Sequence, residues 1–357
     1  FGAGSRAPIA ISVFVKNPEA TDHGRIFFHD IGDYLDQKQK LAIIRDFGAV
    51  KGISNAKAWE RIIPDDQNDW LNQRDASFDV FMKIGDKKSD QGDVMFQNYT
   101  HGVVTSRDAW CYQSSPSKLK HNIEKSISFF NDEIRRKAQG GYSGDIEKFI
   151  EIDGTKISWS RALKVDATRE KSIDVASGSV VLSLYRPFTK QSLYFSRRYN
   201  EMVYQLPKVF PTDEVAINRA IMVKGNWRQT GHFALMTNAL PCYQPDGGAQ
   251  CFPLYLYDQQ DEEPGGLFEG QSSGLQRRDA ITDAGLAHFQ EGYPGEEITK
   301  EDLFYYVYGL LHSPDYRDRY ADNLTKELPR IPAVKTYADF RAFAEAGRRL
   351  GDLHVNY

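Results

Sequence analysis

Apolar and polar positions are arranged in patterns that divide the chain into expected strands and helices. A nearly continuous apolar run over residues 8–16 is typical of a strand buried on both faces of a sheet, and residues 25–29 predict a second strand. A helix is expected from about Asp33 until Gly48 ends its apolar face.

The clearest helix of the first half is predicted to begin after Ser115, a capping residue, with Pro116 in its first position. Gly140 and Gly141 end the helical pattern. Apolar side chains recur every three or four residues between these ends and form one stripe, made of Leu119, Ile123, Ile127, Phe130 and Ile134.

A strand-rich pattern follows from Ser179. Residues 180–185 and 192–195 flank a connection with Pro187, which predicts a hairpin. Further strands are expected over 215–223, 232–236 and 251–257. Residues 258–274, rich in glycine and acidic residues, predict a mobile loop. The C-terminal part predicts three helices, which begin after Thr299, at Ser313 (continuing to Pro329) and at Thr336.

Composition places the chain among globular proteins of more than one domain, since its 357 residues are 41% hydrophobic and 26% charged. No apolar run is long enough to predict a membrane span. The sequence opens on Phe1 within an apolar stretch, and we expect it to be a piece of a larger protein.

Residues with catalytic or metal-binding chemistry are scattered. The three cysteines are widely spaced, which favours buried free thiols and a reducing, cytoplasmic setting. The eight histidines have no metal-ligand spacing, and there is no P-loop, nucleophile-elbow serine or paired-carboxylate motif. The chain therefore shows no complete catalytic apparatus.

The formal net charge of −4 conceals two segments of opposite sign. Residues 185–230 hold eight Lys and Arg against three acidic residues, or +5, whereas residues 258–302 hold twelve acidic residues against three basic ones, or −9. Both segments suit solvated faces, but the basic one also interleaves aromatic and amide side chains of the kind that contact nucleic acid.

A cluster of glycine, hydroxyl and arginine side chains lies in residues 101–108. Such a turn can hold a phosphate through backbone N–H, hydroxyl and guanidinium groups. A hairpin loop in which Arg107 pairs with Asp108 or another acidic residue explains the same residues. Both interpretations stay open from the residues alone.

Seven stretches resemble the C-terminal part of type ISP restriction–modification enzymes: residues 7–18, 102–108, 185–188, 193–202, 250–255, 281–283 and 301–314. Those enzymes are large bacterial single-chain proteins that fuse a nuclease, a helicase-like ATPase, an adenine-N6 DNA methyltransferase and a target-recognition domain. The catalytic Asn-Pro-Pro-Tyr-type motif of the methyltransferase does not occur here, because Asn17-Pro18 is followed by Glu19.

The resemblance implies an α/β (α+β) chain of three parts. Residues 1–47 would be the C-terminal remnant of an adenine-N6 DNA methyltransferase domain, with residues 9–16 as a late strand of its sheet. Residues 48–274 would form a mixed, β-rich α+β target-recognition core, and residues 275–357 a helical C-terminal subdomain.

The function that the resemblance implies is sequence-specific recognition of double-stranded DNA, which positions the target adenine and directs the fused helicase and nuclease. Arginine and lysine side chains would contact phosphates or guanine, Asn200 and Gln205 would contact adenine edges, and Tyr199 would stack or pack. The candidate DNA-binding residues are Thr105, Arg107, Arg186, Lys190, Arg197, Arg198, Tyr199, Asn200, Gln205 and Arg228.

No cofactor is expected in this chain, whereas S-adenosylmethionine, ATP and Mg²⁺ are expected for the parent enzyme. The expected partners are DNA and the upstream methyltransferase and helicase domains, and not a membrane. Two alternatives stay open: part of a split or solitary adenine-N6 methyltransferase, or a docking module. The docking module would use C-terminal tyrosines, for which local core packing is the favoured explanation, namely Tyr305, Tyr306, Tyr308 and Tyr316.

Overall fold

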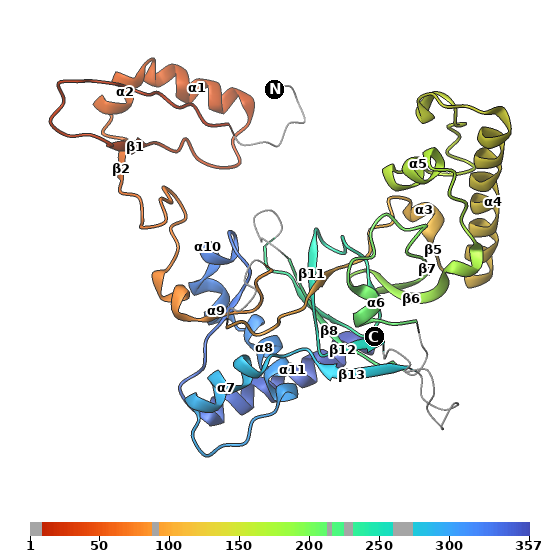
Figure 1. Ribbon diagram of the computed structural model, residues 1–357. Coiled ribbons are helices and arrows are strands. Elements are labelled where there is room, and N and C mark those ends of the chain that lie inside the picture. Colours follow the sequence, from red (N-terminus) through yellow and green to blue (C-terminus); the bar gives the residue numbers. More distant parts are fainter. Residues whose placement is uncertain (1–8, 88–92, 213–215, 225–230, 260–273) are drawn as a thin grey trace. The chain divides into compact units, whose positions relative to one another are not determined.

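The computed structural model describes residues 9–87, 93–212, 216–224, 231–259 and 274–357. The chain forms two compact units, Phe1–Arg74 and Asp75–Tyr357, each of which is described by itself (Figure 1). Helices and small sheets occur together, which confirms the predicted mixed α and β class.

The first unit contains a strand pair and two helices. Strand β1 (Ile26–Phe28) pairs antiparallel with β2 (Glu60–Ile62). Helix α1 (Gln37–Phe47) begins with a capping box, in which Asp36 and Gln39 exchange two hydrogen bonds of 2.8 Å, and ends at Gly48 with φ +65°. Helix α2 spans Val50–Asn55. The predicted second strand and first helix are confirmed, the helix starting a few residues later than expected.

The predicted strand over residues 8–16 is wrong for the residues described. Residues 9–16 have no regular secondary structure and are exposed, with Ile11 at 82% and Phe14 at 87% exposure. A strand buried on both faces needs neighbouring strands and a cover, and the described sheet of this unit contains only β1 and β2. The apolar pattern therefore has no surface within this unit to pack on.

The second unit contains two four-stranded sheets, of which the first has the order β10-β6-β7-β5. Strands β6 (Ser179–Arg186) and β7 (Thr189–Phe195) form the predicted hairpin, with Val181 opposite Leu193. Strand β5 (Tyr112–Gln113) pairs antiparallel with β7, and β10 (Leu240–Pro241) pairs parallel with β6.

The second sheet has the order β4-β11-β8-β9 and is antiparallel. Its strands are β4 (Thr100–His101), β11 (Ala249–Pro253), β8 (Ala220–Lys224) and β9 (Ala234–Thr237). The single strand expected over 251–257 is two strands, because the chain breaks at Leu254 and continues as β12 (Tyr255–Gln259), which pairs with β13 (Leu275–Asp279). Most of the predicted loop, residues 260–273, lies outside the described residues.

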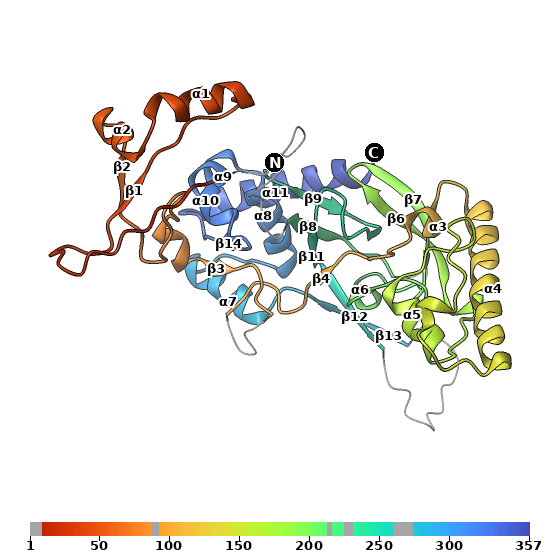
Figure 2. The same ribbon diagram turned by 90° about the horizontal axis from the view of Figure 1, so that it is seen from above.

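Helix α4 (Pro116–Gly140) confirms the clearest prediction. Ser115 accepts a hydrogen bond from the Lys118 amide, Gly141 ends the helix in the left-handed conformation, and the predicted stripe is buried. Figure 2 shows α4 beside α5 (Arg161–Thr168) and the β6–β7 hairpin, with α3 (Asp108–Cys111) and α6 (Leu206–Val209) nearby. Short 3₁₀ helices lie at Ala76–Val80, Ile146–Lys148 and Val175–Ser177.

The C-terminal part is helical, as predicted. Helix α8 (Lys300–Leu311) packs along α11 (Tyr337–Val355), which also contacts β9. A Cβ at Gly347 would lie 2.0 Å from the Tyr305 carbonyl oxygen, so glycine permits this close approach. The remaining elements are α7 (Asp283–Gly292), α9 (Pro314–Arg319), α10 (Ala321–Leu324), and strands β3 (Met82–Lys83) and β14 (Arg330–Ile331).

Two expectations for this part are changed by packing. The helix predicted from Ser313 to Pro329 is broken at Tyr320 into α9 and α10. The tyrosines considered for docking are buried, three of them on α8, whose residues 303–311 are all covered, and Tyr316 on α9; they belong to the core rather than to a free surface. None of the helices within the described ranges is long and apolar enough to cross a membrane.

Candidate nucleic-acid interface

Two segments that the sequence singled out lie side by side in the second unit. Val104 in the 102–108 turn and Met202 exchange backbone hydrogen bonds of 2.9 Å and 3.0 Å. Val103 forms a parallel bridge with Cys242, and a Cβ at Gly102 would lie 2.3 Å from the Cys242 carbonyl oxygen. Glycine at this position therefore allows three distant segments to meet.

Arg107 is buried beneath this junction. Its guanidinium donates to the carbonyl oxygens of Tyr199 and Ser158 and to the Ser160 hydroxyl. Asp108 does not pair with it and instead accepts a hydrogen bond from Thr105, which is also buried. Burial lowers the pKa of Arg107 from its ordinary value. Arg107 thus binds backbone carbonyl groups of the protein itself, which neither interpretation of the turn predicted.

Tyr199 and Asn200 are buried as well. The Tyr199 hydroxyl donates to Ser126 at 2.6 Å, and burial raises the pKa of Tyr199 well above its ordinary value. The Asn200 amide donates to the Tyr194 carbonyl at 3.2 Å and accepts from the Ser196 amide at 2.9 Å. Together with Thr105 and Arg107, these side chains are used to shape the segment, and their placement favours a structural role.

Arg197 and Arg198 lie at the surface, where they line an open groove of about 580 Å³ between α5 and residues 197–202. Arg198 forms an ion pair of 3.0 Å with Asp166 and donates to the Lys171 carbonyl at 3.3 Å. We call this site the basic groove, and its lining residues are Arg161, Ala162, Val165, Asp166, Lys171, Arg197, Arg198, Asn200, Glu201 and Met202.

The charge of the basic groove is four cations against two carboxylates, or +2. Both carboxylates are engaged by the protein, because Glu201 accepts from the Ala162 amide at the start of α5 at 3.3 Å and Asp166 holds Arg198. Among the residues that the structure describes, no carboxylate forms an ion pair with Arg161, Lys171 or Arg197. Sequence reasoning missed Arg161 and Lys171, because only the fold brings the α5 region beside residues 197–202.

The other candidates lie elsewhere. Arg186 stacks on Tyr185, with its guanidinium carbon 3.9 Å from the ring centroid, and Lys190 donates to the Val355 carbonyl at 2.8 Å. Gln205 is exposed, and its backbone amide donates to Thr100 at 3.1 Å. Arg228 lies outside the described residues.

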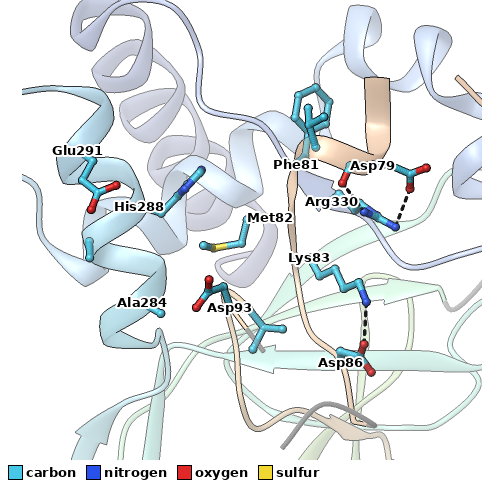
Figure 3. A pocket seen from close by; sticks show the side chains of 13 residues that line it. Asp79, Phe81, Met82, Lys83, Asp86, Asp93, Ala284, His288, Glu291 and Arg330 are labelled. Carbon is cyan, nitrogen blue, oxygen red and sulfur yellow. Dashed lines mark hydrogen bonds and ion pairs between the residues drawn. The ribbon is translucent and has the colours of Figure 1, made fainter. Parts of the chain in front are cut away.

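A second groove, of about 550 Å³, has the opposite charge (Figure 3). Lys83 pairs with Asp86 at 2.9 Å and Arg330 pairs with Asp79 at 2.8 Å, so both of its cations are engaged by carboxylates. Four acidic residues against two cations make this site unfavourable for phosphate. We call it the acidic groove, and its lining residues are Asp79, Val80, Phe81, Met82, Lys83, Asp86, Asp93, Val94, Ala284, Ala287, His288, Glu291 and Arg330.

Metal and thiol chemistry finds no support in the part of the chain that the structure covers. No group of three His, Cys, Asp or Glu side chains is arranged there to hold a metal ion. Cys111, Cys242 and Cys251 are buried free thiols, as predicted, and burial raises the pKa of Cys111 to about 12.

Comparisons with known proteins point to one family over most of the chain. A family model described as the type ISP C-terminal specificity domain matches residues 94–357. No curated protein matches the chain in sequence.

Three solved structures are similar to the chain. The ATP-dependent type ISP restriction–modification enzyme LlaBIII bound to DNA is 31% identical over 95% of this chain, with a TM-score of 0.77. A nuclease-deletion mutant of the type ISP enzyme LlaGI with a DNA substrate mimic is 33% identical over 95%, with a TM-score of 0.76. A DrdV–DNA complex is 31% identical over 93%, with a TM-score of 0.73. The chain spans 20%, 28% and 31% of these longer chains, respectively.

Proposed function

This chain belongs to the type ISP specificity-domain family, and from that membership we propose that it recognises a specific sequence of double-stranded DNA for a restriction–modification enzyme. The three similar structures were all determined with DNA or a DNA mimic. The family match covers residues 94–357, which include the basic groove and the 102–108 turn.

The observation that carries the proposal is the basic groove. Phosphate contacts fix the register of a protein on duplex DNA, and arginine is suited to them because its planar fork can donate two hydrogen bonds to one phosphate. Arg161 and Arg197 supply such forks on one open surface, and Lys171 adds a third cation. The net charge of −4 does not oppose this role, since binding depends on the local field rather than on the sum.

Adenine methylation requires the target base to leave the stack, and a recognition domain can hold the neighbouring bases while this happens. We propose that the chain positions the target adenine in this way and directs a fused helicase and nuclease. S-adenosylmethionine, ATP and Mg²⁺ would act in other domains of a longer protein, as the greater length of the similar proteins suggests.

We further propose that residues 1–47 complete a methyltransferase domain. The exposed apolar side chains of Ile11, Val13 and Phe14 support this, since they suit a strand that adds to another domain's sheet. The upstream methyltransferase and helicase domains would then be the protein partners.

A titration of the chain on a pool of genomic duplexes at several salt concentrations tests the proposal. We expect binding near micromolar at low salt that weakens as salt rises, because counterions are released from the DNA. The double substitution Lys171→Glu and Arg197→Glu should reduce affinity by at least about 100-fold, since each lost charge-assisted contact contributes roughly 1.5–3 kcal/mol.

The matched control is Lys38→Glu with Lys40→Glu, which makes the same charge change on an exposed helix of the first unit. It should leave affinity within about threefold, as expected when the lost charges make no phosphate contact. A folded chain with no salt-dependent binding, or equal losses from both double variants, would contradict the proposal.

A further inference from the structure

Aromatic and amide side chains gather at the edge of the β4-β11-β8-β9 sheet. His101 on β4 lies opposite Gln250 on β11, and their side-chain Nε2 atoms are 3.4 Å apart. The His101 ring centroid is 5.1 Å from that of Tyr204 and 5.3 Å from that of Tyr243. We call these four residues the aromatic–amide cluster.

Two backbone hydrogen bonds and two nearby glycines hold Tyr243 in place. The Tyr243 amide donates to the Val103 carbonyl, and its carbonyl accepts from the Ala249 amide, both at 2.9 Å. A Cβ at Gly248 would lie 2.8 Å from the Tyr243 hydroxyl, and one at Gly102 would lie 2.6 Å from the Tyr243 amide nitrogen. Glycine at both positions therefore lets Tyr243 pack close to β4.

Tyr204 has an unusual backbone for an aromatic residue, with φ +46°. Bulky side chains rarely adopt this left-handed region, and such strain is found most often at functional sites. Its side chain is not buried, since the residue is 40% exposed. Core packing therefore does not account for a tyrosine at this position.

The polar atoms of the cluster have a defined arrangement. His101 Nδ1 donates to the Ala249 carbonyl at 3.3 Å, which leaves its Nε2 to accept from the Gln250 amide. Burial lowers the pKa of His101, which keeps the ring neutral. Gln250 Oε1 is buried without a hydrogen-bond partner among the described residues, and an unpaired amide oxygen is costly until a donor reaches it.

One short segment connects this cluster to the basic groove. Residues 197–202 line the groove, and Tyr204 follows two residues later. Met202 both lines the groove and pairs with Val104, three residues after His101. Phosphate-type and base-type side chains are thus carried by one short segment of the chain and its neighbour on β4, a division of roles that DNA-reading proteins use.

We propose that the aromatic–amide cluster reads a base of the recognised sequence. Tyr204 and Tyr243 supply aromatic faces, and Gln250, oriented by His101, has an unpaired Oε1 that would accept from a base-edge donor such as the adenine amino group once the side chains that cover it move aside. The inference rests on the proposed function, because it assigns base readout to the surface whose neighbouring groove holds phosphate.

Selection from a random-sequence duplex library, with sequencing of the DNA bound by the 357-residue chain, tests it. Tyr204→Gly removes the ring and suits the left-handed backbone, and Gln250→Met removes the amide at similar length. Each should lower discrimination at one or two positions roughly 5- to 150-fold, the range expected for a lost base contact. Affinity for the unselected library should stay within about twofold, because it depends on phosphate contacts.

The matched controls are Tyr34→Ala and Gln139→Ala, an exposed tyrosine and an exposed glutamine far along the chain from the cluster. Both should keep the selected sequence of the unsubstituted chain. Circular dichroism and thermal unfolding of every variant confirm that the fold is retained.

The outcomes separate the two proposals. If the unsubstituted chain does not bind duplex DNA, the proposed function fails and the inference fails with it. If it selects a sequence that both cluster variants also select with equal discrimination, the inference is overturned while the proposed function stands. Binding without any sequence preference overturns both, because the proposed function is recognition of a specific sequence.

Discussion

The basic groove and the acidic groove have nearly the same volume, about 580 Å³ and about 550 Å³, but they differ in which charges the protein uses for itself. In the basic groove the carboxylates are engaged, because Glu201 accepts from the first turn of α5 and Asp166 holds Arg198. In the acidic groove the cations are engaged, by Asp86 and Asp79. The sign that is left available to a ligand is therefore opposite in the two sites.

The two grooves also differ in the arginine that stabilises each of them. Arg107, behind the basic groove, is buried and donates to backbone carbonyls and a hydroxyl. Arg330, in the wall of the acidic groove, is partly exposed; it pairs with Asp79 and Glu327 and also donates to the carbonyl of the exposed Asp79. Replacing a buried arginine leaves buried carbonyl groups without a hydrogen-bond donor, whereas the exposed partners of the other arginine can bind water instead.

The largest effect is expected from removing these arginines. Arg107→Met should lower the free energy of unfolding by roughly 3–5 kcal/mol, since at least two buried acceptors lose their donor at about 1–3 kcal/mol each. Arg330→Met should lower it by only about 1 kcal/mol, because the carboxylates that it leaves can be hydrated. Urea unfolding followed by circular dichroism measures both.

Arg107→Lys is the control, since it keeps the charge but loses the planar fork, and it should fall between the two methionine variants. Equal losses of stability for Arg107→Met and Arg330→Met would break the comparison between the grooves.

A smaller effect is expected from acid. It concerns two histidines, His312 and His232, neither of which lines the basic groove or the acidic groove. Burial lowers the pKa of His312 to about 4 and that of His232 to about 3. These rings are neutral in the folded protein but take up protons near pH 6.5 when unfolded, so their contribution is complete above pH 6.5 and is lost as pH falls toward 4.

We therefore expect the free energy of unfolding to fall by about 1–2 kcal/mol per histidine from pH 7 to 5, after allowance for partial exposure. His312→Phe should flatten this dependence, measured by urea unfolding at each pH. Any loss of DNA affinity in this range should follow unfolding. A loss of affinity in fully folded protein would show that the groove itself titrates.

The smallest effect is expected in the salt dependence of DNA binding. Arg197→Gln in the basic groove should reduce the slope of log affinity against log salt by about 1, the value for one lost phosphate contact. Lys83→Gln removes one cation from the acidic groove and should leave the slope unchanged, because Lys83 is paired with Asp86. Fluorescence anisotropy at four or more salt concentrations gives both slopes, and equal changes would mean that the grooves do not differ toward DNA.

Local signals predicted much of the fold. Ser115 and Gly141 bound α4, Thr299 caps α8, and Pro187 lies in the turn of the β6–β7 hairpin, as their residue types indicate. These predictions succeed because capping and turn formation depend on neighbours in sequence. Residues 9–16 failed because a doubly buried strand depends on partners that the pattern cannot name.

The sequence pointed to segments of the candidate site but not to the arrangement of its side chains. The 102–108 turn and the 193–202 stretch were both singled out, and the structure brings them together. Which side chains face outward was not predictable, since Arg107 and Asn200 are buried while Arg197 is exposed. No pattern in the sequence linked Arg161, His101 or Gln250 to that segment, because they lie tens of residues away along the chain.

The sequence by itself determined the helix boundaries, the hairpin, the segregation of charge and the family resemblance, because each depends on residue type and local spacing. Only the tertiary structure decided which cations remain available and which are used internally. That outcome depends on contacts between residues tens of positions apart, such as Arg107 with Tyr199 and Arg198 with Asp166. A buried arginine donates its hydrogen bonds to the protein and cannot reach a ligand, and burial is a property of the folded chain.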